Sequence, residues 1–206
     1  MKKIFCLVLM LLCMASSCFA VEIQGWDRTE FPGILEFQYP PTLQLREPYE
    51  KIKADTEAVK SGVQKRAIMR FGPNQAMGGK YAKVQVRVQN IKKDLGAFGQ
   101  PIQLTQEDIQ AWQGEYLADF ANSLGHTIEL TNPAEFHKVS GNNCVYMEYH
   151  YKGKDDNMEW YDYIYQFYDR GRVYRVRISV RADEYKYWTR PGTDIRHIVT
   201  TLKPLG

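Results

Sequence analysis

Cysteine is scarce in this sequence, and most of it lies in one short segment. Only four of the 206 residues are cysteine, and Cys6, Cys13 and Cys18 fall within the first 18 positions. If those residues belong to a cleaved leader, Cys144 is the single thiol of the mature chain. An intramolecular disulfide is then excluded, so the stability of the protein must come from its core.

The first twenty residues have the pattern of a secretory signal peptide. Lys2 and Lys3 precede an apolar run from Ile4 to Met14, which is shorter than the roughly 20 residues that span a bilayer. Small residues follow, and we expect cleavage after Ala20, which leads to a periplasmic or secreted protein. A lipoprotein acylated at Cys18 is the alternative.

The mature chain has almost no net charge. The 27 basic and 24 acidic residues give +3, but two of the lysines lie in the leader, so 25 basic and 24 acidic residues remain. This balance argues against nucleic acid as a partner. No second apolar run of membrane-spanning length follows the leader. The 186 residues from 21 to 206 have the length of a single domain.

Signatures of catalysis are also lacking. The sequence has no Gly-x-Ser-x-Gly elbow and no His-Glu-x-x-His helix. The glycines of residues 72–80 do not have the spacing of a phosphate-binding loop. Cys144 has no neighbouring residues that mark it as a nucleophile, and such a thiol usually behaves as a small buried residue. A hydrolase whose active-site residues are dispersed along the chain is the alternative interpretation.

The first half of the mature chain contains strand patterns and one ambiguous segment. Residues 34–40 predict a short strand, and residues 65–71 and 80–91 predict a hairpin. In its second strand, Val84, Val86 and Val88 alternate with Lys83, Gln85, Arg87 and Gln89. Residues 46–65 fit either a weak helix or a long loop.

Two segments predict helices. Residues 104–125 contain an N-cap at Thr105 with Asp108 three positions later, and Gly125 as a stop. The apolar stripe of this segment consists of Ile109, Trp112, Tyr116, Phe120 and Leu124. Residues 193–202 carry a second apolar stripe. The sequence therefore predicts an α+β fold, a mainly antiparallel sheet covered by helices.

Residues 159–181, with seven aromatic residues and five arginines, predict a hairpin. A turn at Arg170 and Gly171 brings apolar residues opposite each other on one face. The expected pairs are Phe167 with Tyr174, Tyr165 with Val176, Tyr163 with Ile178, and Tyr161 with Val180. Left bare, these rings would form a larger apolar patch than soluble monomers usually expose, so we expect helices to bury this face.

The reverse face of this meander is polar and supplies the candidate site residues. We expect it to carry Glu148, His150, Asp162, Gln166, Arg175 and Arg177. Pairing of Asp162 with the diagonal Arg177 is the structural interpretation. If Glu148 lies opposite Asp162, these two and His150 form a candidate divalent-metal site, with ligand types that suit zinc or manganese. Arg175, Arg177 and Gln166 are the candidate binding residues.

The order of elements resembles that of the PsbP-like superfamily of photosystem accessory proteins and small exported bacterial proteins. The resemblance rests on "FQYP", the valine-rich hairpin, "LTQEDIQAW", "VSGNNCVYMEYHY", "YIYQFYDRGRVYRVRISV" and "IRHIVTTLK". It implies a sheet sandwiched between helices and members that are mostly accessory or binding proteins without catalysis, some with bound metal ions. Residues 46–65 depart from the family's short connection, and no family ligand residue can be transferred.

These observations predict an exported, non-catalytic accessory or binding protein whose partner is a protein or a small molecule. No cofactor is expected except for the candidate metal. The alternatives are the dispersed hydrolase and a metal-binding protein that uses Glu148, His150 and Asp162.

Overall fold

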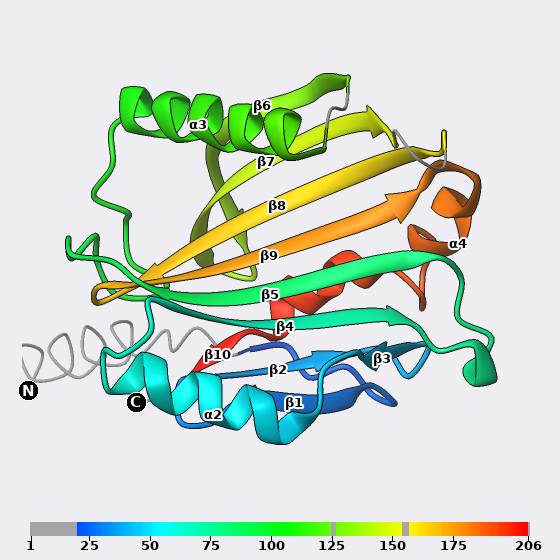
Figure 1. Ribbon diagram of the computed structural model, residues 1–206, viewed down its shortest axis with the longest axis horizontal. Helices are drawn as coiled ribbons and strands as arrows, with labels where there is room; N and C mark the ends of the chain where they lie inside the picture. Colours follow the sequence, from blue (N-terminus) through cyan, green and yellow to red (C-terminus); the bar gives the residue numbers. More distant parts are fainter. Residues whose placement is uncertain (1–19, 125–126, 154–156, 206) are drawn as a thin grey trace, which may run out of the picture.

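The computed structural model describes residues 20–124, 127–153 and 157–205 (Figure 1). The predicted signal peptide, apart from Ala20, lies outside these residues. A seven-stranded sheet has the order β3-β4-β5-β9-β8-β7-β6, and every neighbouring pair is antiparallel. Its strands are β3 (Leu43–Leu45), β4 (Arg66–Pro73), β5 (Ala82–Asn90), β6 (Ile128–Val139), β7 (Asn142–Lys152), β8 (Glu159–Asp169) and β9 (Arg172–Arg181).

A second, three-stranded sheet has the order β1-β2-β10. It consists of β1 (Asp27–Phe31), β2 (Leu35–Tyr39) and β10 (Lys203–Pro204). The strand predicted at residues 34–40 corresponds to β2, in which Leu35 and Phe37 are fully buried. The longer helices are α2 (Tyr49–Lys60) and α3 (Gln106–Leu124), and the short ones are η1 (Gln75–Met77), η2 (Ala182–Glu184), α4 (Tyr185–Trp188) and η3 (Ile195–Thr201).

The two faces of the large sheet are covered at opposite ends. On one face, α3 packs against the side chains of β6, β7 and β8, with Val173 of β9 at the margin. On the other face, the small sheet, α2 and η3 bury the apolar residues of β4, β5, β8 and β9. Figure 1 shows α3 along β6 and β7 at one edge, while α2, β1 and β2 lie at the opposite edge. The α+β fold with a mainly antiparallel sheet covered by helices is confirmed.

The predicted β8–β9 hairpin has the expected register. Tyr161, Tyr163, Tyr165 and Phe167 face Val180, Ile178, Val176 and Tyr174. Arg170 and Gly171 form the turn with φ angles of 44° and 80°, a geometry that suits glycine at the second position. Tyr163, Tyr165 and Phe167 are buried in the larger core, so most of this face is interior as predicted. The small sheet covers it together with α2 and η3, whereas the predicted helix α3 lies on the opposite face.

The orientation expected for β7, with Glu148 and His150 on the same face of the sheet as Asp162, is wrong. Val145 pairs with Gln166, and Tyr149 pairs with Asp162, so the apolar side of β7 lies beneath α3 and not on the tyrosine side. Cys144 faces the tyrosine side for the same reason. Because β8 is buried on both faces, the alternation of β7 alone does not tell which side continues the tyrosine face.

Two segments with weak helical patterns in the sequence form helices in the structure. The ambiguous residues 46–65 contain α2, which buries Ile52, Thr56 and Val59, whereas Val63 is 81% exposed beyond its end. The last predicted helix is the 3₁₀ helix η3, with four buried residues. The capping interaction of α3 is present as predicted. The amide and hydroxyl of Thr105 donate to Oδ2 of Asp108 at 2.8 and 3.0 Å, and the Asp108 amide donates to the Thr105 hydroxyl at 3.1 Å.

Within the described part of the chain, no helix combines the length and the apolar character needed to cross a membrane.

Candidate anion-binding face

On its face of the large sheet, α3 covers β6, β7 and β8, and its side chains reach Arg175 and Arg177 on β9. Among the described residues, the α3-side surface of β4 and β5 is not part of the apolar cluster beneath α3. Strand alternation turns apolar residues such as Met69 and Val86 into the core and cations outward. We call the outward cations the arginine face: Arg66, Arg70, Lys83, Arg87, Arg175 and Arg177.

A buried ion pair anchors the inner side of this face. Arg177 donates from Nε to Oδ2 of Asp162 at 2.5 Å, and the hydroxyl of Tyr149 donates to the same oxygen at 2.7 Å. Asp162 has no exposed surface, while 23% of the Arg177 side chain is exposed. Burial alone would lower the pKa of Arg177, but the Asp162 carboxylate raises it above its ordinary value. The predicted diagonal pairing is therefore present, although it is buried and not on an exposed surface.

Arg175 is held in place without a carboxylate. Its Nε donates to Oε1 of Gln166 at 2.8 Å, and the Gln166 amide donates to the hydroxyl of Tyr168. The guanidinium carbon lies 5.5 Å from the ring centre of Trp112 and 5.3 Å from that of Tyr116, both on α3. These cation–π contacts orient the side chain. Burial leaves the charge of Arg175 poorly solvated and thereby lowers the pKa of its guanidinium.

Arg87 is the most poorly compensated member of the face. It lies directly opposite Arg175 across the β5–β9 pair. Its Nε is shielded from solvent and has no hydrogen-bond partner among the described residues. Burial, together with repulsion from Arg175, Arg66 and Arg70, lowers the pKa of Arg87 to about 10. The guanidinium is thus held among other cations.

Apart from the pairing of Asp162 with Arg177, carboxylates neutralise only the margins of the arginine face. Glu47 accepts from Nη1 of Arg70 at 2.6 Å. Asp183 lies 2.5 Å from Nε of the neighbouring Arg181. Lys83 instead lies over the ring of Trp160, 4.4 Å from its centre. Within the described ranges, no carboxylate lies at ion-pair distance from Arg66, Lys83, Arg87 or Arg175. Such an excess of cations on one open surface attracts anions.

The sequence identified part of this face. Arg175, Arg177 and Gln166 were the predicted binding residues, and all three lie on the α3 side of β8 and β9. The other four members, Arg66, Arg70, Lys83 and Arg87, were not among the predicted binding residues. The outward position of Arg87 was visible in the alternation of residues 82–88, but the pairing of β5 with β9 connects strands more than 80 residues apart along the chain, and no local pattern specifies it.

The candidate metal ligands are not brought together. Glu148 pairs with Tyr163 and not with Asp162, so the expected pairing is wrong. Glu148 and His150 lie on the tyrosine side of the sheet, whereas Asp162 lies beneath α3. The carboxylate of Glu148 accepts hydrogen bonds from Tyr146 at 2.9 Å and from Asn132 at 2.7 Å. Among the described residues, no group of three or more His, Cys, Asp or Glu side chains has a geometry that could hold a metal ion.

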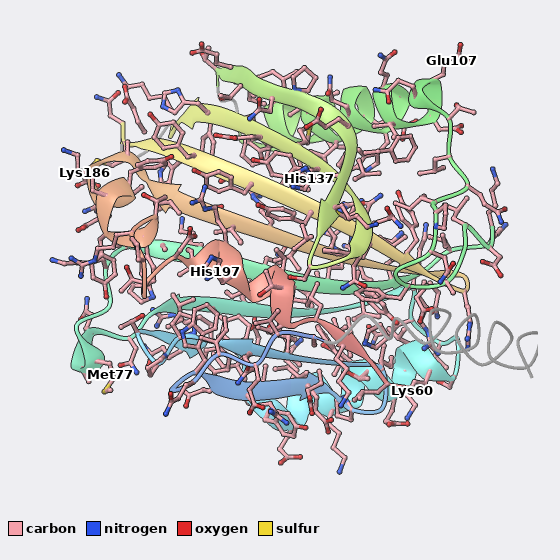
Figure 2. The ribbon with its side chains drawn as sticks, turned by 180° about the vertical axis from the view of Figure 1, so that it is seen from behind. Lys60, Met77, Glu107, His137, Lys186 and His197 are labelled. Atoms are coloured by element: carbon pink, nitrogen blue, oxygen red, sulfur yellow. The ribbon has the colours of Figure 1, made fainter. Side chains whose placement is uncertain are left out.

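The hydrolase alternative requires a nucleophile in contact with a base. Cys144 and His137 are direct partners across the β6–β7 pair. The thiol is fully buried, however, and burial raises its pKa to about 12. The ring of His137 lies against Tyr146, with 5.2 Å between ring centres. Figure 2 shows His137 on β6, on the side of the sheet away from α3. A thiol in this state is a poor nucleophile.

A cavity of about 430 Å³ lies elsewhere, beside β1, β2 and the start of α2. It is lined by Arg28, Thr29, Glu30, Glu36, Tyr39, Leu45 and Tyr49. Neither Cys144 nor His137 lines it. The described structure therefore offers the arginine face as the surface whose charges are least satisfied within the chain.

Comparison with known proteins shows what this architecture is similar to. No protein-family model matches the sequence, and no curated protein matches it significantly. The solution structure of cyanobacterial PsbP (CyanoP) from Synechocystis sp. PCC 6803 matches with a TM-score of 0.55 and 17% identity, over 93% of this chain and 99% of that one. A crystal structure from Bacteroides thetaiotaomicron has a TM-score of 0.49 and 11% identity, and the match covers 88% of this chain and 49% of that one. The chain shares its fold with PsbP, as the order of its elements predicted.

Proposed function

We propose that this chain is an exported, non-catalytic accessory protein that binds an anionic partner through its arginine face. Export is supported by the leader pattern of the first twenty residues. The accessory role is supported by the PsbP-like fold. Fold alone does not define a function, so the choice of binding surface rests on the residues themselves.

One observation carries this proposal: the side-by-side arrangement of Arg87 and Arg175 without a carboxylate partner. Like charges directly opposite each other on neighbouring strands destabilise a sheet. An anion at this surface would remove that penalty. Because the face lies on strands of a rigid sheet, binding requires little ordering of the protein.

A fluorescently labelled hexaglutamate peptide tests the proposal by anisotropy at low and moderate salt. Replacement of Lys83 or Arg66 by methionine removes one exposed charge and is expected to weaken binding about three- to tenfold. The matched control is Lys53→Met, which removes an exposed cation from α2 and should leave the affinity unchanged. Equal affinity of all three variants and the unaltered protein would refute the arginine face as the binding surface.

A further inference from the structure

Three arginines converge at one corner of the arginine face. Arg87 on β5 is the direct partner of Arg175 on β9. On the other side of β5, Arg66 of β4 pairs with Gln89, which places it diagonal to Arg87. Directly opposite side chains have Cβ atoms about 5 Å apart and diagonal ones about 7–8 Å apart, within the reach of arginine side chains. We call Arg66, Arg87 and Arg175 the arginine corner.

The arginine corner is locally unfavourable in the free protein. Repulsion from Arg175 and Arg66 acts on Arg87, and so does that from Arg70. Two pairs further along this face of the same two strands, no such repulsion arises, because the neutral Ser179 lies opposite Lys83. Side chains that break a local rule without compensation within the chain are expected where a protein has a function to perform.

Within the arginine corner, Arg175 is preorganised. Gln166 and the rings of Trp112 and Tyr116 fix Arg175 from the side of α3 and β8. Its Nε is occupied, while its Nη groups have no hydrogen-bond partner among the described residues. A fixed guanidinium with free Nη donors is suited to bidentate recognition of an oxyanion.

We propose that the arginine corner binds a phosphate group in its doubly charged form. This inference rests on the proposed function and specifies the chemistry of the ligand. Three guanidinium groups match a dianion with three terminal oxygens better than a carboxylate, which has one charge and two oxygens. Arginine forks pair with phosphate oxygens in a bidentate geometry.

The extent of the free charge favours an isolated phosphate over the backbone of a nucleic acid. Glu47 neutralises Arg70 beyond one side of the corner, and Asp162 neutralises Arg177 on the next row. A duplex presents a phosphate charge about every 1.7 Å along its axis and needs a longer track of free cations.

Calorimetric titration with glycerol phosphate tests the site directly. Arg87→Met keeps the unbranched stem of the side chain and removes its charge, so we expect about tenfold weaker binding. Lys53→Met is again the matched control and should bind normally. Thermal unfolding of the free variants checks folding, and Arg87→Met should not lower the melting temperature, because a repelled charge has been removed.

The pH dependence of binding separates a dianion from a monoanion. The second pKa of a phosphate ester is about 6, so glycerol phosphate should bind more tightly at pH 7.5 than at pH 5. The groups that face Arg87 and Arg175 are Arg66 and Arg70 of β4, Tyr116 of α3 and Tyr168 of β8. These groups are arginines and tyrosines, with no histidine or carboxylate among them, so sulfate, which is doubly charged throughout this pH range, should show no such change.

Binding measurements with a soluble phosphate ester and with lipid vesicles distinguish the two possible sources of the phosphate group. Binding of glycerol phosphate supports a soluble ester, and binding to phosphatidic acid vesicles supports a lipid headgroup. The phosphate site is overturned if acetate binds as tightly as glycerol phosphate, if Arg87→Met has no effect, or if a short RNA competes far better than either. If hexaglutamate still depends on Lys83 in that case, the arginine face stands as the binding surface and only the phosphate assignment fails.

Discussion

Asp162 is a carboxylate with no exposed surface in the middle of the large sheet. Its charge is tolerated because Arg177 and Tyr149 both donate to Oδ2. The other oxygen, Oδ1, is buried without a hydrogen-bond partner among the described residues. Taking two charges out of water is costly, so such a pair stabilises little by itself, but removal of one member leaves the other uncompensated.

We expect Asp162→Asn to lower the free energy of unfolding by about 3 kcal/mol, at the lower end for a broken buried pair because Arg177 is partly exposed. Chemical denaturation measures this change. The double variant Asp162→Leu with Arg177→Met is the control, since it leaves no unpaired charge and should lose less stability than Asp162→Asn. A loss as large in the double variant would show that packing and not charge dominates.

At the scale of elements, α3 has a well-defined start and an amphipathic face. Thr105 and Asp108 satisfy each other's backbone amides. Ile109 and Phe120 are buried against the sheet, while Trp112 and Tyr116 extend over Arg175. The helix thus covers the part of one face formed by β6, β7 and β8, and it also forms a wall of the arginine corner.

Thr105→Ala removes the N-cap hydroxyl of α3 and should lower the free energy of unfolding by about 1 kcal/mol. A double-mutant cycle with Asp108→Ala, followed by urea denaturation, tests whether the two side chains act together. Because they bond to each other, the two losses should not add. Strict additivity would contradict a reciprocal cap.

For the molecule as a whole, both faces of β8 are buried, one beneath α3 and the other beneath the small sheet and η3, and the interior is rich in tyrosine. Among the described residues six tyrosines are buried, and burial raises the pKa of five of them: Tyr149, Tyr163, Tyr165, Tyr168 and Tyr174. Burial disfavours the charged phenolate in the folded state alone. The folded protein therefore retains these protons at a pH where the unfolded chain has lost them.

Stability should consequently be constant below about pH 9 with respect to these groups and fall as the pH rises through 10, the ordinary tyrosine pKa. Each buried tyrosine contributes a slope of up to about 1.4 kcal/mol per pH unit above that point. Absorbance at 295 nm, recorded with near-ultraviolet circular dichroism, checks this expectation. Ionisation of nearly all tyrosines near pH 10 without loss of the circular dichroism signal would contradict a buried tyrosine core.

The sequence by itself determined the features that depend on neighbouring residues. The β8–β9 register followed from the turn at Arg170 and Gly171, and the start of α3 followed from Thr105 and Asp108. These features were predictable because strand alternation, turn geometry and helix capping act over a few residues. The α+β class followed from the same patterns.

Only the tertiary structure decided which faces and which distant strands meet. The side of β7 that lies beneath α3 depends on the β7–β8 register, which separated Glu148 from Asp162 and removed the candidate metal site. The arginine corner depends on β5 and β9 becoming neighbours. Side chains along a strand point to the two faces of the sheet in turn, which the sequence shows directly. Packing against the rest of the molecule decides which of the two faces is covered and which charges are left without a partner.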